Sequence, residues 1–133
     1  MREILFRGKR IDNGEWIEGY LYVTHNGEHE IGSYDPEVKI ERMTYVVDPS
    51  TVGQYTGLKD KNGKRIFERD IIKIPDDYDE FGMNAGEVYQ VYFCCGGFRL
   101  KPKYSEARGY WLEDDNTVEI IGNIHDNPEL IGG

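Results

Sequence analysis

Residues 15–23 read Glu15-Trp16-Ile17-Glu18-Gly19-Tyr20-Leu21-Tyr22-Val23. Side chains alternate between the two sides of an extended chain, so the even-numbered residues from Trp16 to Tyr22 share one side and the odd-numbered ones share the other. Aromatic and branched residues with a period of two are typical of a half-buried strand. The stretch therefore predicts a strand.

Shorter segments of the same kind occupy residues 4–9, 43–48, 70–74, 87–93, 98–102 and 117–122. Between them lie dipeptides that suit tight hairpin loops: Asn13-Gly14, Asn26-Gly27, Asn62-Gly63 and Gly96-Gly97. Helical signals are confined to residues 50–53, residues 76–85 and the last residues, where Asn127 precedes Pro128. We predict a mainly β fold, or β-rich α+β, whose N-terminal half consists of antiparallel hairpins.

The charge is unevenly distributed along the 133 residues, which carry 16 Lys and Arg against 25 Asp and Glu, a net charge of −9. Residues 1–65 hold 10 basic against 11 acidic residues, a net of −1, whereas residues 66–133 hold 6 against 14, a net of −8. This asymmetry predicts two subdomains, an N-terminal β-hairpin subdomain (1–65) and an acidic one (66–133).

The chain has no obvious membrane or export segment. Its longest apolar run, from Val91 to Cys95, has five residues, far short of the ~20 that a membrane helix needs. The N-terminal residues lack the apolar stretch of a signal peptide. We expect a cytoplasmic protein with an ordinary core, which at this length requires no metal or disulfide.

Histidines and cysteines give little support for catalysis or a metal site. His25 and His29 flank Asn26-Gly27, and in a two-residue hairpin residue 25 pairs with 28 and residue 24 with 29, which sends the two rings to opposite faces. His125 beside Asp126 suits a base held by a carboxylate, although a local hydrogen bond at a strand end is the simpler expectation.

Cys94 and Cys95 are adjacent, too close for a disulfide with each other, and they lack the spacing of a zinc or redox motif. We predict two reduced thiols and no cofactor.

Residues 57–65, Gly57-Leu58-Lys59-Asp60-Lys61-Asn62-Gly63-Lys64-Arg65, superficially resemble a phosphate loop. Five residues instead of four separate the glycines, and Arg65 stands where Ser or Thr must hold magnesium. The Asn62-Gly63 pair instead predicts a hairpin turn. Because no serine lies in a nucleophile elbow either, we predict that the chain is not an enzyme, with a small carboxylate-dependent enzyme as an alternative.

Two polar runs carry most of the clustered carboxylates, and no calcium-loop pattern accompanies them. We treat them as candidate partner-binding residues: Asp76, Asp77, Asp79, Glu80, Glu113, Asp114 and Asp115. The same runs are compatible with an acidic mimic of DNA that occupies a DNA-binding protein.

The alternative of direct nucleic-acid binding depends on basic residues of the first half: Arg7, Lys9, Arg10, Lys59, Lys61, Lys64 and Arg65. Phosphate contacts supply most non-specific affinity. Asp12, Glu15 and Asp60 interrupt this set, and the net charge opposes binding, so we rank nucleic acid below protein partners.

Three blocks of the sequence together resemble the YopX family of phage and prophage proteins. They are Phe6-Arg7-Gly8-Lys9-Arg10 with residues 14–21, the central Val52-Gly53-Gln54-Tyr55-Thr56-Gly57-Leu58 continuing to Lys64 and residues 66–68, and Ile121-Gly122-Asn123-Ile124-His125-Asp126-Asn127-Pro128-Glu129-Leu130. The resemblance implies a bacterial or phage cytoplasmic protein, mainly β, with a small SH3-like barrel in the C-terminal half. It implies no catalytic or ligand residues.

One position departs from the family's usual Phe-Glu-Gly-Asp, because this chain has Phe67-Glu68-Arg69-Asp70. If the glycine serves a turn with positive φ, Arg69 is strained or the turn is reshaped. With no catalytic constellation, the leading functional hypothesis is a non-enzymatic interaction or self-assembly protein. Its expected partners are further copies of itself or a host or phage protein, and no membrane.

Overall fold

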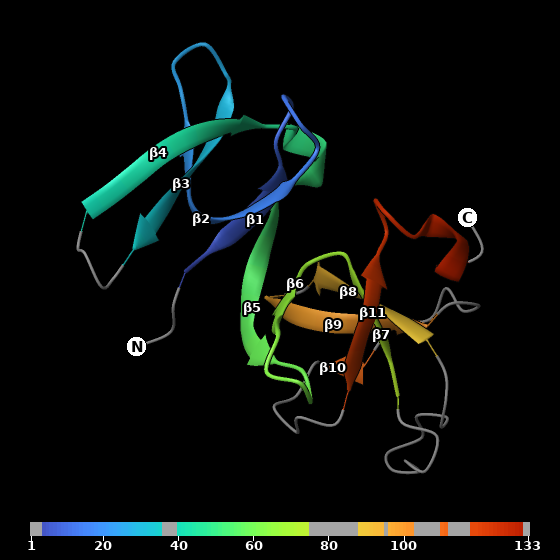
Figure 1. Ribbon diagram of the computed structural model, residues 1–133. Helices are drawn as coiled ribbons and strands as arrows, with labels where there is room; N and C mark the ends of the chain where they lie inside the picture. Colours follow the sequence, from blue (N-terminus) through green and yellow to red (C-terminus); the bar gives the residue numbers. More distant parts are fainter. Residues whose placement is uncertain are drawn as a thin grey trace. The chain divides into compact units, whose positions relative to one another are not determined.

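The structure is a computed structural model that describes residues 4–35, 40–74, 88–94, 96–102, 110–111 and 118–131. Within them lie eleven strands and two short 3-10 helices (Figure 1): β1 (Phe6–Lys9), β2 (Trp16–Val23), β3 (His29–Asp35), β4 (Ile40–Val47), η1 (Pro49–Thr51), β5 (Gly53–Lys59), β6 (Arg65–Phe67), β7 (Asp70–Lys73), β8 (Val88–Cys94), β9 (Gly97–Pro102), β10 (Tyr110–Trp111), β11 (Glu119–Asn123) and η2 (Pro128–Ile131). The strands form two antiparallel sheets, which confirms the mainly β prediction.

The chain divides into two compact units, unit 1 (Met1–Tyr55) and unit 2 (Thr56–Gly133). The basic stretch 59–65 thereby belongs to unit 2. Unit 1 then carries 6 basic and 10 acidic residues, a net of −4, and unit 2 carries 10 and 15, a net of −5. The domains predicted at 1–65 and 66–133 stay a prediction. With the division after Tyr55, however, the two units have nearly equal net charges.

Unit 1 is a sheet whose strands follow the order β4-β3-β2-β1-β5. Phe6 of β1 pairs with Gly19 of β2 on one side and with Gln54 of β5 on the other. Arg10, which directly follows β1, forms an isolated bridge with Val47 at the end of β4. Because this bridge connects the outermost strand β4 to the end of β1, strands β1 to β4 form a closed ring.

Two glycines allow this ring to close tightly. A Cβ atom at Gly19 would collide with the carbonyl oxygen of Gly32 on β3, and one at Gly8 would lie 3.0 Å from side-chain atoms of Val47. Ile31 and Val47 fill the interior and are 0% and 1% exposed. Strand β2 has the predicted alternation, with Gly19 buried and Leu21 half-buried while Tyr20 and Tyr22 are exposed.

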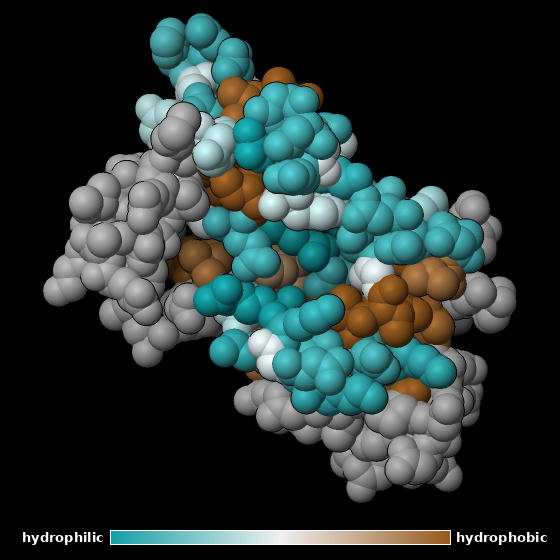
Figure 2. All heavy atoms as spheres, viewed as in Figure 1, coloured by the Kyte–Doolittle hydropathy of each residue, from teal (hydrophilic) through white to brown (hydrophobic). Residues whose placement is uncertain are grey.

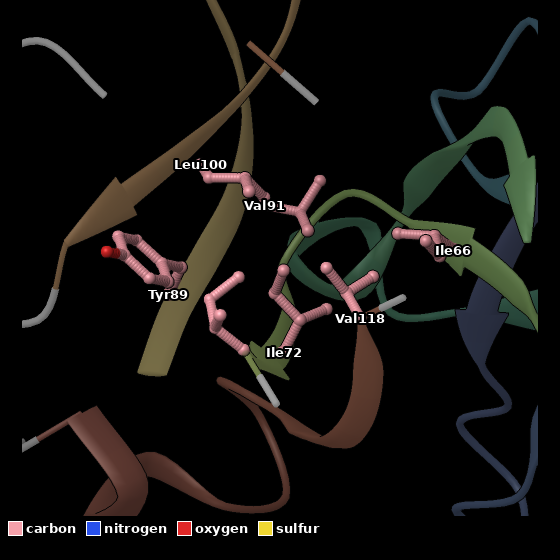
Figure 3. Close-up of a cluster of buried hydrophobic side chains, with 7 residues drawn as sticks. Ile66, Ile72, Tyr89, Val91, Leu100 and Val118 are labelled. Atoms are coloured by element: carbon pink, nitrogen blue, oxygen red, sulfur yellow. The ribbon is translucent and has the colours of Figure 1, made fainter. Parts of the chain in front are cut away.

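Unit 2 contains a second sheet with the order β10-β9-β8-β7-β11. Its core combines side chains from four strands with residues adjacent to β7 and β11, and Figure 3 shows most of them converging: Ile66, Ile72, Ile74, Tyr89, Val91, Leu100 and Val118. Strand β5 pairs with β6, and Leu58 of β5 packs against this core. The SH3-like form of this half stays a prediction consistent with the antiparallel sheet.

Four strands, β3, β5, β6 and β10, were not among the ranges predicted from the sequence, and one loop register was predicted wrongly. The strands β3 and β5 contain glycine and polar residues that rarely favour strands, and they are held by pairing with neighbours on the sheet. The hairpin between β2 and β3 was predicted to pair residue 24 with 29, which is wrong, because Val23 pairs with His29. Gly27 takes a φ of 85° there, as in a three-residue loop that ends in a left-handed residue.

Arg69 lies in the turn between β6 and β7 with a φ of 72°. Its N–H donates to the carbonyl of Val91 at 2.8 Å, and its carbonyl accepts from the N–H of Ile124 at 3.0 Å. The backbone is therefore fixed on both sides of this residue. Arg69 therefore occupies the left-handed conformation that glycine favours, which is the conformation expected if the glycine of the family pattern serves a turn with positive φ.

We predict that Gly19→Ala lowers the free energy of unfolding by about 1–3 kcal/mol, because the added methyl group meets backbone that cannot move without breaking the β2–β3 pairing. Gly8→Ala is the comparison, since its methyl group would lie 3.0 Å from side-chain atoms of Val47, a smaller overlap than the one at Gly19, and should cost less. Urea titration of both variants measures the difference. Equal losses would show that the close approach of Gly19 to Gly32 does not limit the ring.

We also predict that Arg69→Gly raises the free energy of unfolding by about 0.5–1 kcal/mol, because relief of the left-handed conformation exceeds glycine's additional entropy in the unfolded chain. Glu68→Gly is the matched control at a neighbouring position with ordinary φ, and it should destabilise. Thermal and urea unfolding check both variants. Destabilisation by both would contradict the assignment of strain to Arg69.

Candidate functional site

The carboxylate of Asp60 lies at the centre of the β5–β6 hairpin and is 2% exposed. One oxygen accepts the backbone N–H groups of Asn62 and Lys64, both at 2.9 Å, and the other accepts the N–H of Ile120 at 3.1 Å. A buried charge is tolerated when hydrogen bonds satisfy it in this way. Asp60 thus has a structural role, and it joins the hairpin to β11.

These contacts also show whether residues 57–65 form a phosphate loop or a hairpin. Asp60 N–H donates to the carbonyl of Lys64 at 2.8 Å, and Gly63 closes the turn with a φ of 81°. A phosphate loop needs inward-facing N–H groups for its ligand, but here the N–H groups of Asn62 and Lys64 are directed at Asp60. The hairpin prediction is confirmed.

The seven predicted basic residues fall into two groups. Lys59, Lys61, Lys64 and Arg65 are exposed around the β5–β6 turn of unit 2, and we call them the cationic hairpin. Within it, Nζ of Lys61 lies 3.4 Å from a carboxylate oxygen of Glu119. The other three residues, Arg7, Lys9 and Arg10, belong to unit 1.

The three candidate basic residues that lie in unit 1 contact aromatic rings. The guanidinium of Arg7 lies 4.8 Å and Nζ of Lys9 lies 5.6 Å from the ring centroid of Trp16. Arg10 stacks 3.9 Å above the ring of Tyr45 and donates two hydrogen bonds to Asp12, at 3.0 and 2.6 Å. Those hydrogen bonds lower the pKa of Asp12 and raise that of Arg10.

The cross-strand register places several of these groups on one side of the sheet. Arg7 pairs with Glu18 and Lys9 with Trp16 across β1 and β2, and residues two apart on a strand share a face. Tyr20 and Tyr22 continue that face and are 53% and 61% exposed. We call these residues of β1 and β2 the tyrosine face. The alternation of residues 15–23 was the signal for it, although sequence alone did not assign the tyrosines to a site.

Apolar exposure elsewhere is scattered. In the view of Figure 2, hydrophobic residues reach the described surface in separate patches among hydrophilic ones. The exposed large apolar side chains outside the tyrosine face include Ile11 and Phe93, in different units. Scattered exposure of this kind is normal for folded proteins and does not define a site.

The last family block forms a turn after β11. Oδ1 of Asn123 accepts the N–H groups of His125 and Asp126, both at 3.0 Å, and its amide donates to the Asp126 carboxylate at 3.2 Å. Asn127 closes the turn by accepting from the Asn123 N–H at 3.3 Å. The backbone N–H of His125 thus helps to form this turn, whereas the role of its imidazole stays a prediction.

The structure describes only some of the remaining candidate residues. His29 contacts the carbonyl of Gly27 at 3.2 Å through Nδ1, and no group of His, Cys, Asp and Glu suited to a metal occurs among the residues that the structure describes. Cys94 is half-buried. Seven acidic candidates and Cys95 lie outside the described residues: Asp76, Asp77, Asp79, Glu80, Glu113, Asp114 and Asp115. The roles predicted for them stay predictions.

The fold is that of a small antiparallel β protein with two units. Its polar motif residues Asp60 and Asn123 stabilise turns and sheet contacts. The chain belongs to the YopX family, because the family model described as YopX protein matches residues 5–132. No helix in the described part of the chain is long and apolar enough to cross a membrane.

The chain is also similar to a prophage protein in sequence and to a solved structure in fold. A protein of Bacillus subtilis (strain 168), the "SPbeta prophage-derived uncharacterized protein YopX", is 34% identical over 76 residues. That match spans 53% of each chain, about half the length of the relative. The crystal structure of protein EF1440 from Enterococcus faecalis covers 98% of this chain and 99% of its own, with a TM-score of 0.57 and 21% identity. At this identity the likeness shows the shared fold.

We predict that Asp60→Asn lowers the free energy of unfolding by about 2–3 kcal/mol, because an amide keeps the shape but cannot accept all three backbone hydrogen bonds. Asp12→Asn is the matched control, since its carboxylate is exposed, and it should change stability little. Urea unfolding compares the two. Similar small effects would show that Asp60 is not the centre of the hairpin.

Proposed function

We propose that this chain is a non-enzymatic interaction module that self-associates through the tyrosine face of unit 1, in the cytoplasm of a bacterial host. The observation that carries the proposal is the exposure of Tyr20 and Tyr22 at the centre of a paired sheet, where β1 and β3 flank β2. Tyrosine, tryptophan and arginine are the residues that interfaces favour, since they give large contact areas with a polar tip.

The tyrosine face offers a rigid surface. Its side chains stand on β2, which is hydrogen-bonded to β1 and β3 on both sides. Arg7 and Lys9 are already oriented by the ring of Trp16. Side chains that are ordered before binding lose less entropy on association. The face therefore meets a partner at low entropic cost.

A second copy of the chain is the partner that the charges favour. Arg7 and Lys9 on β1 supply two positive charges, and Glu18 on β2 and Glu30 on β3, which pairs with Tyr22, supply two negative ones. These four charges cancel, although the whole chain has a net charge of −9. A face with both signs and no net charge is complementary to its own copy, as symmetric dimers require.

The non-enzymatic part of the proposal is supported by how the polar motif residues are used. Asp60 and Asn123 are both buried and both accept backbone N–H groups. A general acid or base needs a side chain placed to exchange a proton with a substrate. Side chains committed to backbone contacts in this way stabilise the fold, which suits a binding module.

We predict that the wild-type mass in solution rises with concentration from the 15.4 kDa of one chain to a multiple of it, and that Tyr20→Thr/Tyr22→Thr stays at the mass of one chain. Threonine preserves strand propensity while it removes the rings. Light scattering after size exclusion and sedimentation velocity measure the masses. Circular dichroism and urea unfolding establish that the variant is folded.

Ile11→Thr is the control, because Ile11 is 67% exposed in a turn of the same unit and should leave association unchanged. A wild-type chain that remains monomeric over the accessible concentration range would overturn the proposal. So would a double variant that associates as the wild type does.

A further inference from the structure

The exposed charge of the cationic hairpin depends on the direction in which one carboxylate points. In the sequence, Asp60 interrupts Lys59 and Lys61 and weakens the basic cluster. In the structure, Asp60 is 2% exposed and its oxygens face backbone N–H groups, while the four basic side chains of the hairpin are exposed. The turn therefore presents positive charge to solvent, with its own acid directed inward.

The geometry points to a phosphate-binding surface: we propose that the cationic hairpin binds the phosphate backbone of a nucleic acid without reading its sequence. Its two remaining turn residues are Asn62 and Gly63, so the turn exposes no aromatic or apolar anchor. Protein partners are normally held by such anchors, whereas phosphate contacts need only cations and hydrogen-bond donors. The hairpin suits a polymer with closely spaced phosphates better than an acidic protein surface.

The net charge of −9 does not preclude a local site. At 0.1 M salt the Debye length is about 10 Å, so charges farther from the hairpin are largely screened. Within the hairpin, the pair between Lys61 and Glu119 joins side chains that are 47% and 42% exposed. An exposed pair of this kind contributes little, and Lys61 can exchange it for a phosphate.

The direct test is a titration of the full chain with a fluorescent 20-base-pair DNA duplex of mixed sequence, followed by anisotropy at several salt concentrations. Four phosphate contacts predict a slope of log K against log salt of about −3.6, which is a loss of affinity of roughly 100-fold between 50 and 200 mM salt. Lys64→Gln should weaken binding and reduce the magnitude of the slope by about 0.9. A second duplex of unrelated sequence should bind equally.

Lys101→Gln is the matched control, because Lys101 is an exposed lysine of unit 2 on β9 and its loss changes the net charge by the same amount. Absence of binding by the wild type at low salt would overturn the proposal. Equal weakening by Lys101→Gln and Lys64→Gln would also overturn it, by showing a dependence on total charge. Displacement of the duplex by poly-glutamate at equal charge concentration would assign the hairpin to acidic proteins instead.

The test is independent of self-association. Tyr20→Thr/Tyr22→Thr alters unit 1 and leaves the cationic hairpin of unit 2 intact, so this variant should bind the duplex with the wild-type slope. Urea unfolding of Lys64→Gln establishes that its turn is still stable. A variant that is fully folded and binds as the wild type does would contradict the role of Lys64.

Discussion

The buried carboxylate of Asp60 is the constraint on which unit 2 depends. A charge with 2% exposure is stable only where hydrogen bonds replace water, and here the N–H groups of Asn62, Lys64 and Ile120 do so. The first two bonds shape the turn, and the third fixes it to β11. Because the acid is directed inward, the surrounding cations are left on the outside. One desolvated group thus determines both the local fold and the charge of the exposed surface.

In unit 1 the corresponding constraint is steric. The backbones of β2 and β3 approach so closely at Gly19 and Gly32 that a Cβ atom has no space. The ring closes where Arg10 bridges to Val47, and Ile31 and Val47 fill its interior. Because side chains alternate along β2, the residues next to the buried Gly19 and the half-buried Leu21 lie on the outside, on the same side as Trp16. The exposed aromatic surface therefore follows from which side of β2 faces the ring's interior.

Local features were predictable because they depend on neighbouring residues. The alternation over residues 15–23 gave β2 and the side of the sheet on which Tyr20 and Tyr22 lie, and Asn62-Gly63 gave the hairpin in place of a phosphate loop. The family resemblance identified Arg69 as a residue in a glycine position, and its φ of 72° agrees. The β2–β3 register was missed because a three-residue loop and a two-residue loop share the Asn-Gly signal.

The sequence by itself determined the fold class, the hairpin turns and the family, since these follow from short-range patterns of hydrophobicity, turn residues and motif order. Only the tertiary structure decided that Asp60 faces Ile120, 60 positions away, and that the stretch 59–65 belongs with unit 2. Burial and sheet pairing are long-range properties that arise when distant segments exclude water together. For this reason the sequence alone suggested that Asp60 weakens the basic cluster, whereas in the structure its buried carboxylate shapes the turn that exposes the basic side chains.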